Sequence, residues 1–305
     1  MKTIQNNLAA YLIKLSVLVV LILGFLSCEE VIDVDLDPEE PRLIVDALIR
    51  VDTTQQLTDA NIRVSLSSSF FEDIQPAVVD EMSILIQGSG AFIPYEPVPG
   101  EPGLYRPFPT TISPVADNKI ATSALVDSTV TFLLNIRYQE DLFFASTTFV
   151  PTSAIDSVMQ GEGGLFNEDD TEVIIEFTDT PNREDFYVFD FDFGEFLTSQ
   201  DEFFEGQQFS FSYFYDTEIN PGDEVEISIL GAEEPFFNYI NGLLEQSQQG
   251  ANGPFQTPTA TVRGNILLAE GIDNIEIFNN LDRVDEFALG YFAIAQEFKT
   301  SLVIE

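Results

Sequence analysis

Hydrophobic and polar residues alternate along much of the chain after residue 42, a period of two that is typical of half-buried β-strands. Between residues 61 and 69, Ile62, Val64 and Leu66 alternate with polar positions. Comparable apolar runs predict further strands at residues 43–49, 82–86, 129–138, 143–149, 171–178, 259–268, 288–295 and 298–304. Glycine and proline interrupt these runs, most densely in the turn-rich stretch at residues 94–114. The pattern therefore predicts a mainly β protein.

Aromatic side chains crowd the second half, with 13 Phe or Tyr residues between positions 186 and 215. Phe189, Phe191 and Phe193 share one face of a predicted strand, because alternate residues of a strand point the same way. A second strand repeats this period at Phe209, Phe211, Tyr213 and Tyr215. We predict that the two strands share an aromatic core. The alternative is an exposed stacking platform for a sugar or a peptide.

One helix is predicted at residues 235–249. Pro235 suits the first helical turn, and Glu233 and Glu234 lie at the positive end of the helix dipole. The apolar face of this helix would consist of Phe236, Ile240, Leu243 and Leu244.

Pro151 marks a boundary between two β-rich regions of ordinary domain size. Short strands separated by turns predict that residues 42–150 form an N-terminal Ig-like or transthyretin-like β-sandwich. Residues 151–305 would form a second β-rich domain that contains the one short helix.

The start of the chain has the features of a secretory signal peptide at residues 1–27. Lys2 and Lys14 precede an apolar run that is too short for an ordinary membrane span. Cys28, the only cysteine, closes a stretch (FLSC) similar to the lipobox of bacterial lipoproteins, in which the cysteine is acylated. An ordinary signal peptide with a chance cysteine and an uncleaved anchor are the alternatives. We predict lipidation at Cys28 and a lipidated acidic tether at residues 28–41.

Glu29 and Glu30 directly follow that cysteine. An acidic pair at this position resembles the surface-export signal of bacteroidete lipoproteins. We therefore expect a protein that is anchored in the outer membrane through lipid and faces the cell exterior.

Charge excludes one class of partner. The chain has 12 Lys or Arg and 52 Asp or Glu, a net charge of −40. Because Lys2 and Lys14 leave with the signal peptide, 10 basic residues would remain, for a net charge of −42. A body this acidic repels nucleic acid, so none is expected as a partner.

Residue types limit the possible chemistry. The chain has no His, so it can form neither a Ser-His-Asp triad nor a His-ligated zinc site. The alternating Asp33, Asp35 and Asp37 resemble a calcium loop, but Pro38 stands where an EF-hand needs Gly and Ile44 where it needs Glu. We predict no metal, no cofactor and no catalytic residue.

Several motifs together resemble a bacteroidete outer-membrane lipoprotein family of unassigned function, the DUF4249 family. They are the lipobox, the runs at residues 43–45, 103–105, 238–244, 254–258 and 263–266, and the LGYF motif at residues 289–292. Residues 280–286 depart from the glycine-rich stretch that often precedes that last motif. The family is similar in setting to lipoproteins encoded beside TonB-dependent receptors. The resemblance thus implies a surface partner of a nutrient importer, and it supplies no catalytic residue.

Three functions fit these observations. The first is a non-enzymatic accessory lipoprotein that helps a TonB-dependent receptor to capture or deliver a ligand. The second is a structural or adhesive surface module. The third is a carboxylate-dependent hydrolase, which would need two acids on facing walls about 5–10 Å apart. With 52 acids in the chain, such a pair can always be imagined, so it is no evidence for a hydrolase. The expected location, the missing catalytic groups and the family resemblance all favour the first function.

The anchor can be tested at Cys28. We expect Cys28→Ala to release the protein into soluble fractions or to leave the signal peptide uncleaved, because the acylated side chain is lost. Fatty-acid labelling and membrane fractionation check this. A variant that still carries labelled fatty acid in the outer membrane would show that Cys28 is not the anchor.

Overall fold

Strands dominate the part of the chain that the computed structural model describes, which is residues 41–68, 73–111, 113–163, 171–249, 261–272, 283 and 287–305. The prediction of a mainly β protein is confirmed, and so is the single predicted helix, α2 (Glu234–Gln249). The signal peptide, Cys28, Glu29 and Glu30 lie outside the described residues. No helix within the described ranges is both long and apolar enough to cross a membrane.

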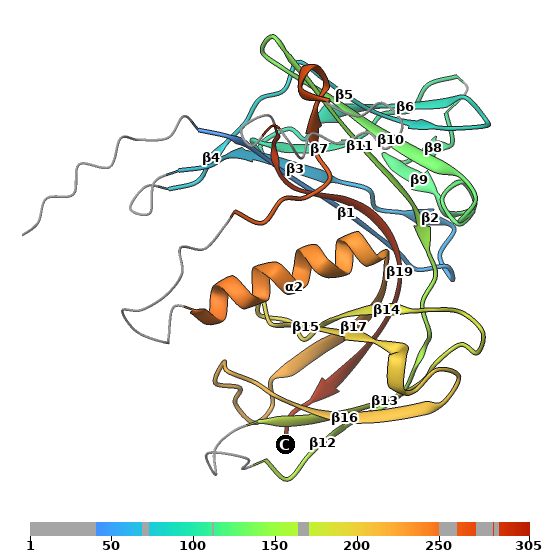
Figure 1. Ribbon diagram of the computed structural model, residues 1–305, viewed down its shortest axis with the longest axis vertical. Coiled ribbons are helices and arrows are strands. Elements are labelled where there is room, and N and C mark those ends of the chain that lie inside the picture. Colours follow the sequence, from blue (N-terminus) through green and yellow to red (C-terminus); the bar gives the residue numbers. More distant parts are fainter. Residues whose placement is uncertain are drawn as a thin grey trace, which may run out of the picture. The chain divides into compact units, whose positions relative to one another are not determined.

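The strands from the first half of the chain form a closed, barrel-like sheet with one strand from the end of the chain (Figure 1). That strand, β19 (Leu289–Val303), pairs in parallel with β1 (Leu43–Val51) and again with the end of β11. The order of the eight strands around the sheet is β19-β1-β3-β7-β6-β5-β10-β11. The other six strands are β3 (Ile62–Leu66), β5 (Glu81–Ile86), β6 (Ala91–Pro97), β7 (Leu104–Pro107), β10 (Thr131–Tyr138) and β11 (Asp141–Val150).

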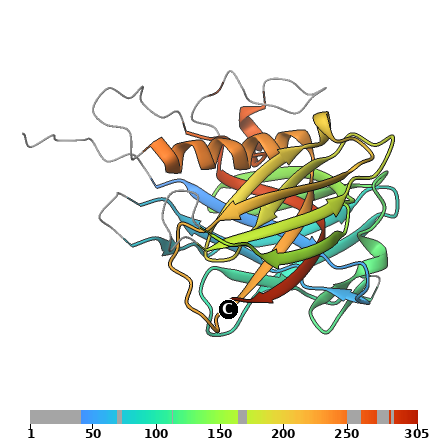
Figure 2. The same ribbon diagram turned by 90° about the horizontal axis from the view of Figure 1, so that it is seen from below.

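The second half of β19 belongs to a β-sandwich. It pairs with β17 (Glu224–Ala232), which continues to β14 (Phe186–Asp190) and β15 (Phe196–Gln200). A separate sheet of β12 (Ile155–Gln160), β13 (Glu172–Thr178) and β16 (Gln208–Phe214) packs against it. Figure 2, which looks from below, shows this smaller sheet in front of the other strands.

Aromatic rings fill the space between these two sheets, as the sequence predicts. Phe189 and Phe191 of one sheet are fully buried, and the Phe191 ring stacks on Tyr213 of the other at 3.7 Å between centroids. Phe193 is the exception, because it lies beyond the end of β14 in a turn with positive φ and is 52% exposed. The turn reverses the chain before Phe193 can join the buried face, so its predicted core position is wrong.

Short elements complete the described chain. They are β2 (Leu57–Thr58), β4 (Gln75–Pro76), β8 (Val115–Ala116), β9 (Lys119–Ala121), β18 (Leu267–Leu268) and the 3₁₀ turns η1 (Thr122–Ala124), η2 (Asp201–Phe203) and η3 (Ala269–Gly271).

The tertiary structure corrects the predictions for three stretches of the chain. β6 and β7 run through the stretch at residues 94–114, where the prolines still accept hydrogen bonds through their carbonyl groups, as Pro94 does from Phe108. The two strands predicted at residues 288–295 and 298–304 are one strand, β19, because Gln296 and Glu297 bond to Thr152 and Arg50 without interrupting it.

The strand predicted at residues 259–268 is reduced to β18 within its described part. Residues 261–266 follow an irregular path beside β19. There the Asn265 side chain donates a hydrogen bond to the Phe292 carbonyl and accepts one from its N–H, each at 2.8 Å. The amide thus substitutes for the backbone of a pairing strand.

The Ig-like or transthyretin-like prediction for residues 42–150 is not clearly met, because the N-terminal strands close into one sheet with β19 instead of stacking as two. The division at residue 151 stays a prediction. One hydrophobic cluster lies within the closed sheet and another between the sheets of the sandwich, and β19 contributes to both.

Phe191 and Phe193 provide a matched test of the aromatic core. We expect Phe191→Ala to lower the free energy of unfolding by about 3–5 kcal/mol, because it leaves a cavity in a packed interior. Phe193→Ala removes the same atoms from an exposed turn and should change stability by about 0.5 kcal/mol or less. Urea denaturation of both variants measures the difference. Equal effects would contradict the assignment of Phe191 to the core.

Candidate functional site

An apolar groove lies where α2 approaches the outer face of β1. Residues of β1 alternate between the interior of the closed sheet and this outer face, so Ile44, Asp46, Leu48 and Arg50 point outward. α2 begins with Glu234 and Pro235 in its first turn, where a negative charge and a fixed φ favour helix formation. The cavity between them has a volume of about 300 Å³. Its lining is Ile44, Val45, Asp46, Leu48, Arg50, Val188, Phe196, Leu230, Phe236, Tyr239, Ile240, Leu243, Gly290 and Tyr291.

Three aromatic residues hold α2 against β19. The Phe236 ring, which is buried, lies 5.0 Å from the Tyr291 ring, and the Tyr239 ring lies 5.1 Å from the same tyrosine. The tilted arrangement of these pairs is favourable for aromatic quadrupoles. Figure 1 shows the helix beside β19 and above the labels of β15 and β17. The predicted apolar face of the helix is correct for Phe236, whereas Leu243 is 39% exposed at the groove mouth.

An ion-pair network closes one end of the groove. The Arg50 guanidinium lies 2.5 Å from Asp190 and 3.2 Å from Glu297. Burial alone would lower the pKa of Arg50, but hydrogen bonds and charges from the two carboxylates outweigh burial and raise it. Arg50 therefore stays charged, and its two carboxylate partners give the network an excess of negative charge.

Two tyrosines of the groove lining have raised pKa values. Burial raises the pKa of Tyr239, and the charge of the nearby Asp46 raises it further. The pKa of Tyr291 is also raised by burial, and then by the charge of Glu233. Both hydroxyls therefore remain protonated at neutral pH, and each can donate a hydrogen bond.

Two glycines allow the backbone to pass closely at the groove wall. Gly290 has a φ of +95°, and a Cβ atom there would lie 1.9 Å from the Val45 carbonyl oxygen. A Cβ atom on Gly264 would lie 1.6 Å from the Gly290 carbonyl oxygen. Two roles are possible for such glycines, shaping the backbone or binding a ligand, and these close approaches account for both as backbone requirements.

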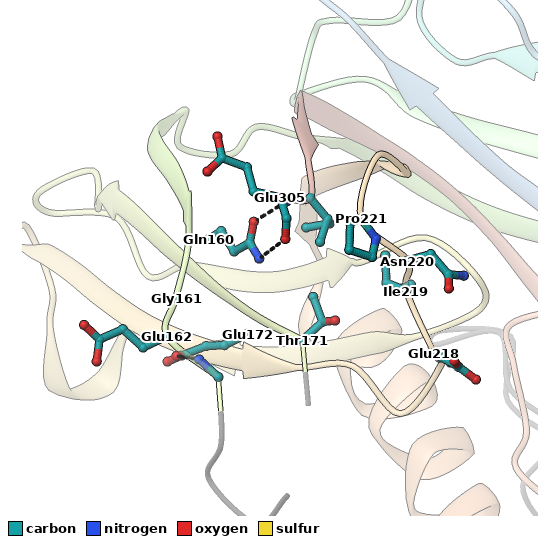
Figure 3. A pocket seen from close by; sticks show the side chains of 12 residues that line it. Gln160, Gly161, Glu162, Thr171, Glu172, Glu218, Ile219, Asn220, Pro221 and Glu305 are labelled. Carbon is teal, nitrogen blue, oxygen red and sulfur yellow. Dashed lines mark hydrogen bonds between the residues drawn. The ribbon is translucent and has the colours of Figure 1, made fainter. Parts of the chain in front are cut away.

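A second cavity, of about 700 Å³, collects acidic side chains at the far end of the sandwich (Figure 3). Glu162, Glu172, Glu218 and Glu305 line it together with small and polar residues. Two hydrogen bonds join Gln160 to Glu305, one of them 2.7 Å long from the Glu305 N–H. Its described lining contains no aromatic ring and no cationic side chain. This cavity offers little apolar surface to a ligand, whereas the groove beside α2 offers much.

Three buried aspartates form a cluster that the sequence did not reveal. The carboxylate oxygens of Asp179, Asp185 and Asp201 lie within 4.8 Å of one another. The Tyr187 hydroxyl bonds to Asp179 and Asp185, and Arg183 lies 2.5 Å from Asp185. Burial raises the pKa of Asp185, although the Arg183 charge opposes this.

Protein donors already occupy this cluster. Backbone N–H groups complete the set, since Gly206 donates to Asp179 at 2.6 Å and Asp185 donates to Asp201 at 2.9 Å. The arrangement is that of a hydrogen-bonded structural cluster that ties the start of β14 to η2. These aspartates belong to different segments of the chain, and the fold brings them together. No local sequence motif could therefore have identified the cluster.

From the sequence, the helix at residues 235–249 and the loop at residues 250–258 are the expected docking surface for a partner, and the alternative is a helix that only caps one end of the β-rich domain. The structure describes the helix alone. Residues 235–249 belong to α2, which packs on the outer faces of β14, β17 and β19. The loop at residues 250–258 and most of residues 280–286 lie outside the described residues. The described part of the helix leaves Asn238 and Glu245 exposed on its far side.

Tyr187 and Tyr215 offer a paired test of the aspartate cluster. We expect Tyr187→Phe to lower the free energy of unfolding by about 1–3 kcal/mol, because two buried carboxylates, Asp179 and Asp185, each lose one of their donors. The Tyr215 hydroxyl is also buried, and it finds no hydrogen-bond partner among the residues that the structure describes, so Tyr215→Phe should cost almost nothing. Thermal or urea unfolding measures both. A neutral Tyr187→Phe would show that the cluster contributes little to stability.

Comparison with known proteins adds one result. A family model, Domain of unknown function (DUF4249), matches residues 29–301. No curated protein matches the chain. Since the match covers most of the sequence, and includes both β1 and most of β19, the chain belongs to the DUF4249 family.

Proposed function

We propose that this protein is a non-enzymatic binding protein, anchored to the outer membrane through Cys28 and facing the cell exterior. In this proposal it serves as an accessory to a TonB-dependent nutrient receptor and helps to capture or deliver a ligand. The observation that carries the binding role is the apolar groove beside α2, which combines aromatic walls with a few polar groups. Ligand sites in proteins usually have this composition.

Residue chemistry supports binding over catalysis. The chain has no His and one Cys, and lipidation would use the single thiol. Arg50 is ion-paired with Asp190 and Glu297, which supports a role in holding the groove in shape. An adhesive surface module is the second candidate, and it would need no ligand groove.

The lipid anchor supports a membrane partner. Two molecules confined to one membrane meet at a high effective concentration, so a modest interface is enough for a lasting complex. The surface-export pair Glu29 and Glu30 supports an exterior position, where a nutrient would first be met. The resemblance to lipoproteins encoded beside TonB-dependent receptors supports that class of partner.

The partner can be tested by affinity purification at natural expression. We expect a tagged protein, purified from outer membranes in mild detergent, to bring down a TonB-dependent receptor in near-stoichiometric amount. The Cys28→Ala variant is the control, since it has the same folded body without the lipid, and in the fraction released from the membrane it should recover much less receptor. Recovery of the protein alone, in both forms, would contradict the accessory role and favour the adhesive module.

A further inference from the structure

Carboxylates outnumber cationic side chains around the groove beside α2. Arg50 is the only cationic residue of the lining, and it is bonded to two carboxylates, so this end of the groove carries a net charge of about −1. Asp46 lies at the mouth, exposed, and its side chain forms no ion pair or hydrogen bond within the described ranges. Arg63 stands opposite Asp46 on β3 and does not line the groove. Even with Arg63 counted beside Arg50, the carboxylates Asp46, Asp190 and Glu297 outnumber the cations. A bound molecule would therefore meet more negative than positive charge.

Aromatic rings lie next to that charge. Phe196, Phe236, Tyr239 and Tyr291 all line the groove, and Asp46 is close enough to Tyr239 for its charge to affect the hydroxyl. Cations bind favourably over the faces of aromatic rings, and the interaction is strongest where water is partly excluded. A cation placed between Asp46 and the tyrosine rings would gain from both the carboxylate and the rings.

Apolar surface in the groove exceeds what packing of the fold uses. Ile44 and Leu48 point out of the closed sheet and stay partly exposed, and Leu243 of α2 is 39% exposed above them. The volume of about 300 Å³ is at the lower end of the range for small-molecule sites, which suits a ligand with one ring or a short alkyl chain. Such a body would remove these side chains from water.

We propose that the groove beside α2 binds a ligand that joins an apolar, ring-sized body to a cationic group, such as an aryl-alkyl ammonium ion. The apolar body lies on Leu48 and the aromatic rings, and the cationic group lies against Asp46. This inference rests on the proposed binding function and specifies the ligand class of its site.

Other ligand charges fit the groove less well. An anionic group would lie beside Asp46 and near the carboxylates that hold Arg50, and like charges at such distances are repulsive. A neutral apolar ligand would cover Asp46 without offering it a partner, and the loss of water from an unpaired carboxylate is costly. Of the three kinds of ligand group, only a cation can replace the water around Asp46 with a favourable charge interaction.

Three probes with one carbon skeleton separate these possibilities. They are 4-phenylbutylammonium, 4-phenylbutan-1-ol and 4-phenylbutanoate, titrated into the full-length protein by calorimetry or by ligand-observed NMR. We expect the ammonium ion to bind at least about tenfold more tightly than the alcohol, and the carboxylate to bind most weakly. The preference should shrink as the salt concentration rises, because the charges at the mouth are exposed to solvent.

Two matched variants locate the site. Asp46→Asn should reduce the affinity for the ammonium ion about three- to tenfold and leave that for the alcohol unchanged. Asp117→Asn removes the same charge from an exposed turn that does not line the groove, and it should change neither affinity. Both positions are exposed, so both variants should fold. Leu48→Trp, which fills the groove, should abolish binding of the ammonium ion and the alcohol alike.

Equal affinities for the three probes, or no binding by any of them, would overturn the inference. An equal loss in Asp46→Asn and Asp117→Asn would overturn it as well, because it would trace the preference to the net charge of the protein. None of these results depends on the receptor, so the ligand class can fail while the affinity purification still succeeds. The reverse outcome would reject the partner and retain the ligand.

Discussion

The backbone pairing of β19 on both edges is the constraint on which the rest of the structure depends. Its first half closes the barrel-like sheet between β1 and β11, and its second half pairs with β17 in the sandwich. Side chains follow the same division. Phe292 and Ile294 pack inside the closed sheet, Phe298 and Leu302 pack in the sandwich, and Ala293 on the opposite face packs under α2. One strand thus contributes to all three hydrophobic clusters.

This arrangement has a consequence for folding. β1 finds its parallel partner near the other end of the chain, so the closed sheet cannot form until nearly all the strands are present. Contacts between residues so far apart in sequence carry a large entropic cost before they contribute stability, which slows folding. In a partly folded form the sheet is still open, so the backbone N–H and C=O groups of its two edge strands are unpaired. Closure of the sheet removes these edges.

The groove beside α2 follows from the position of β19 as well. Because β1 and β19 are parallel neighbours, Asp46 and Tyr291 lie side by side on the same outer face. Gly290 lets β19 approach β1 without a clash, and Gly264 lets the segment before β18 pass close to Gly290 of β19. The helix then packs Phe236 on Tyr291 and leaves Leu243 over the remaining apolar surface. The site is thus the space left where one helix covers two adjacent strands incompletely.

Local patterning was sufficient for most elements of this protein. The alternation at Ile62, Val64 and Leu66 and the apolar spacing after Pro235 depend only on neighbouring residues, so β3 and α2 were predicted from sequence. The absence of His, which excludes a Ser-His-Asp triad and a His-ligated zinc site, could also be read from the sequence alone. Periodicity shows that a residue has a buried face, but it contains no information about what covers that face. The pairing of β1 with β19, the turn that exposes Phe193, the meeting of Asp179, Asp185 and Asp201, and the groove itself all depend on contacts between distant segments. Only the tertiary structure decided them, because the free energy of each depends on which strand lies alongside and not on the local sequence.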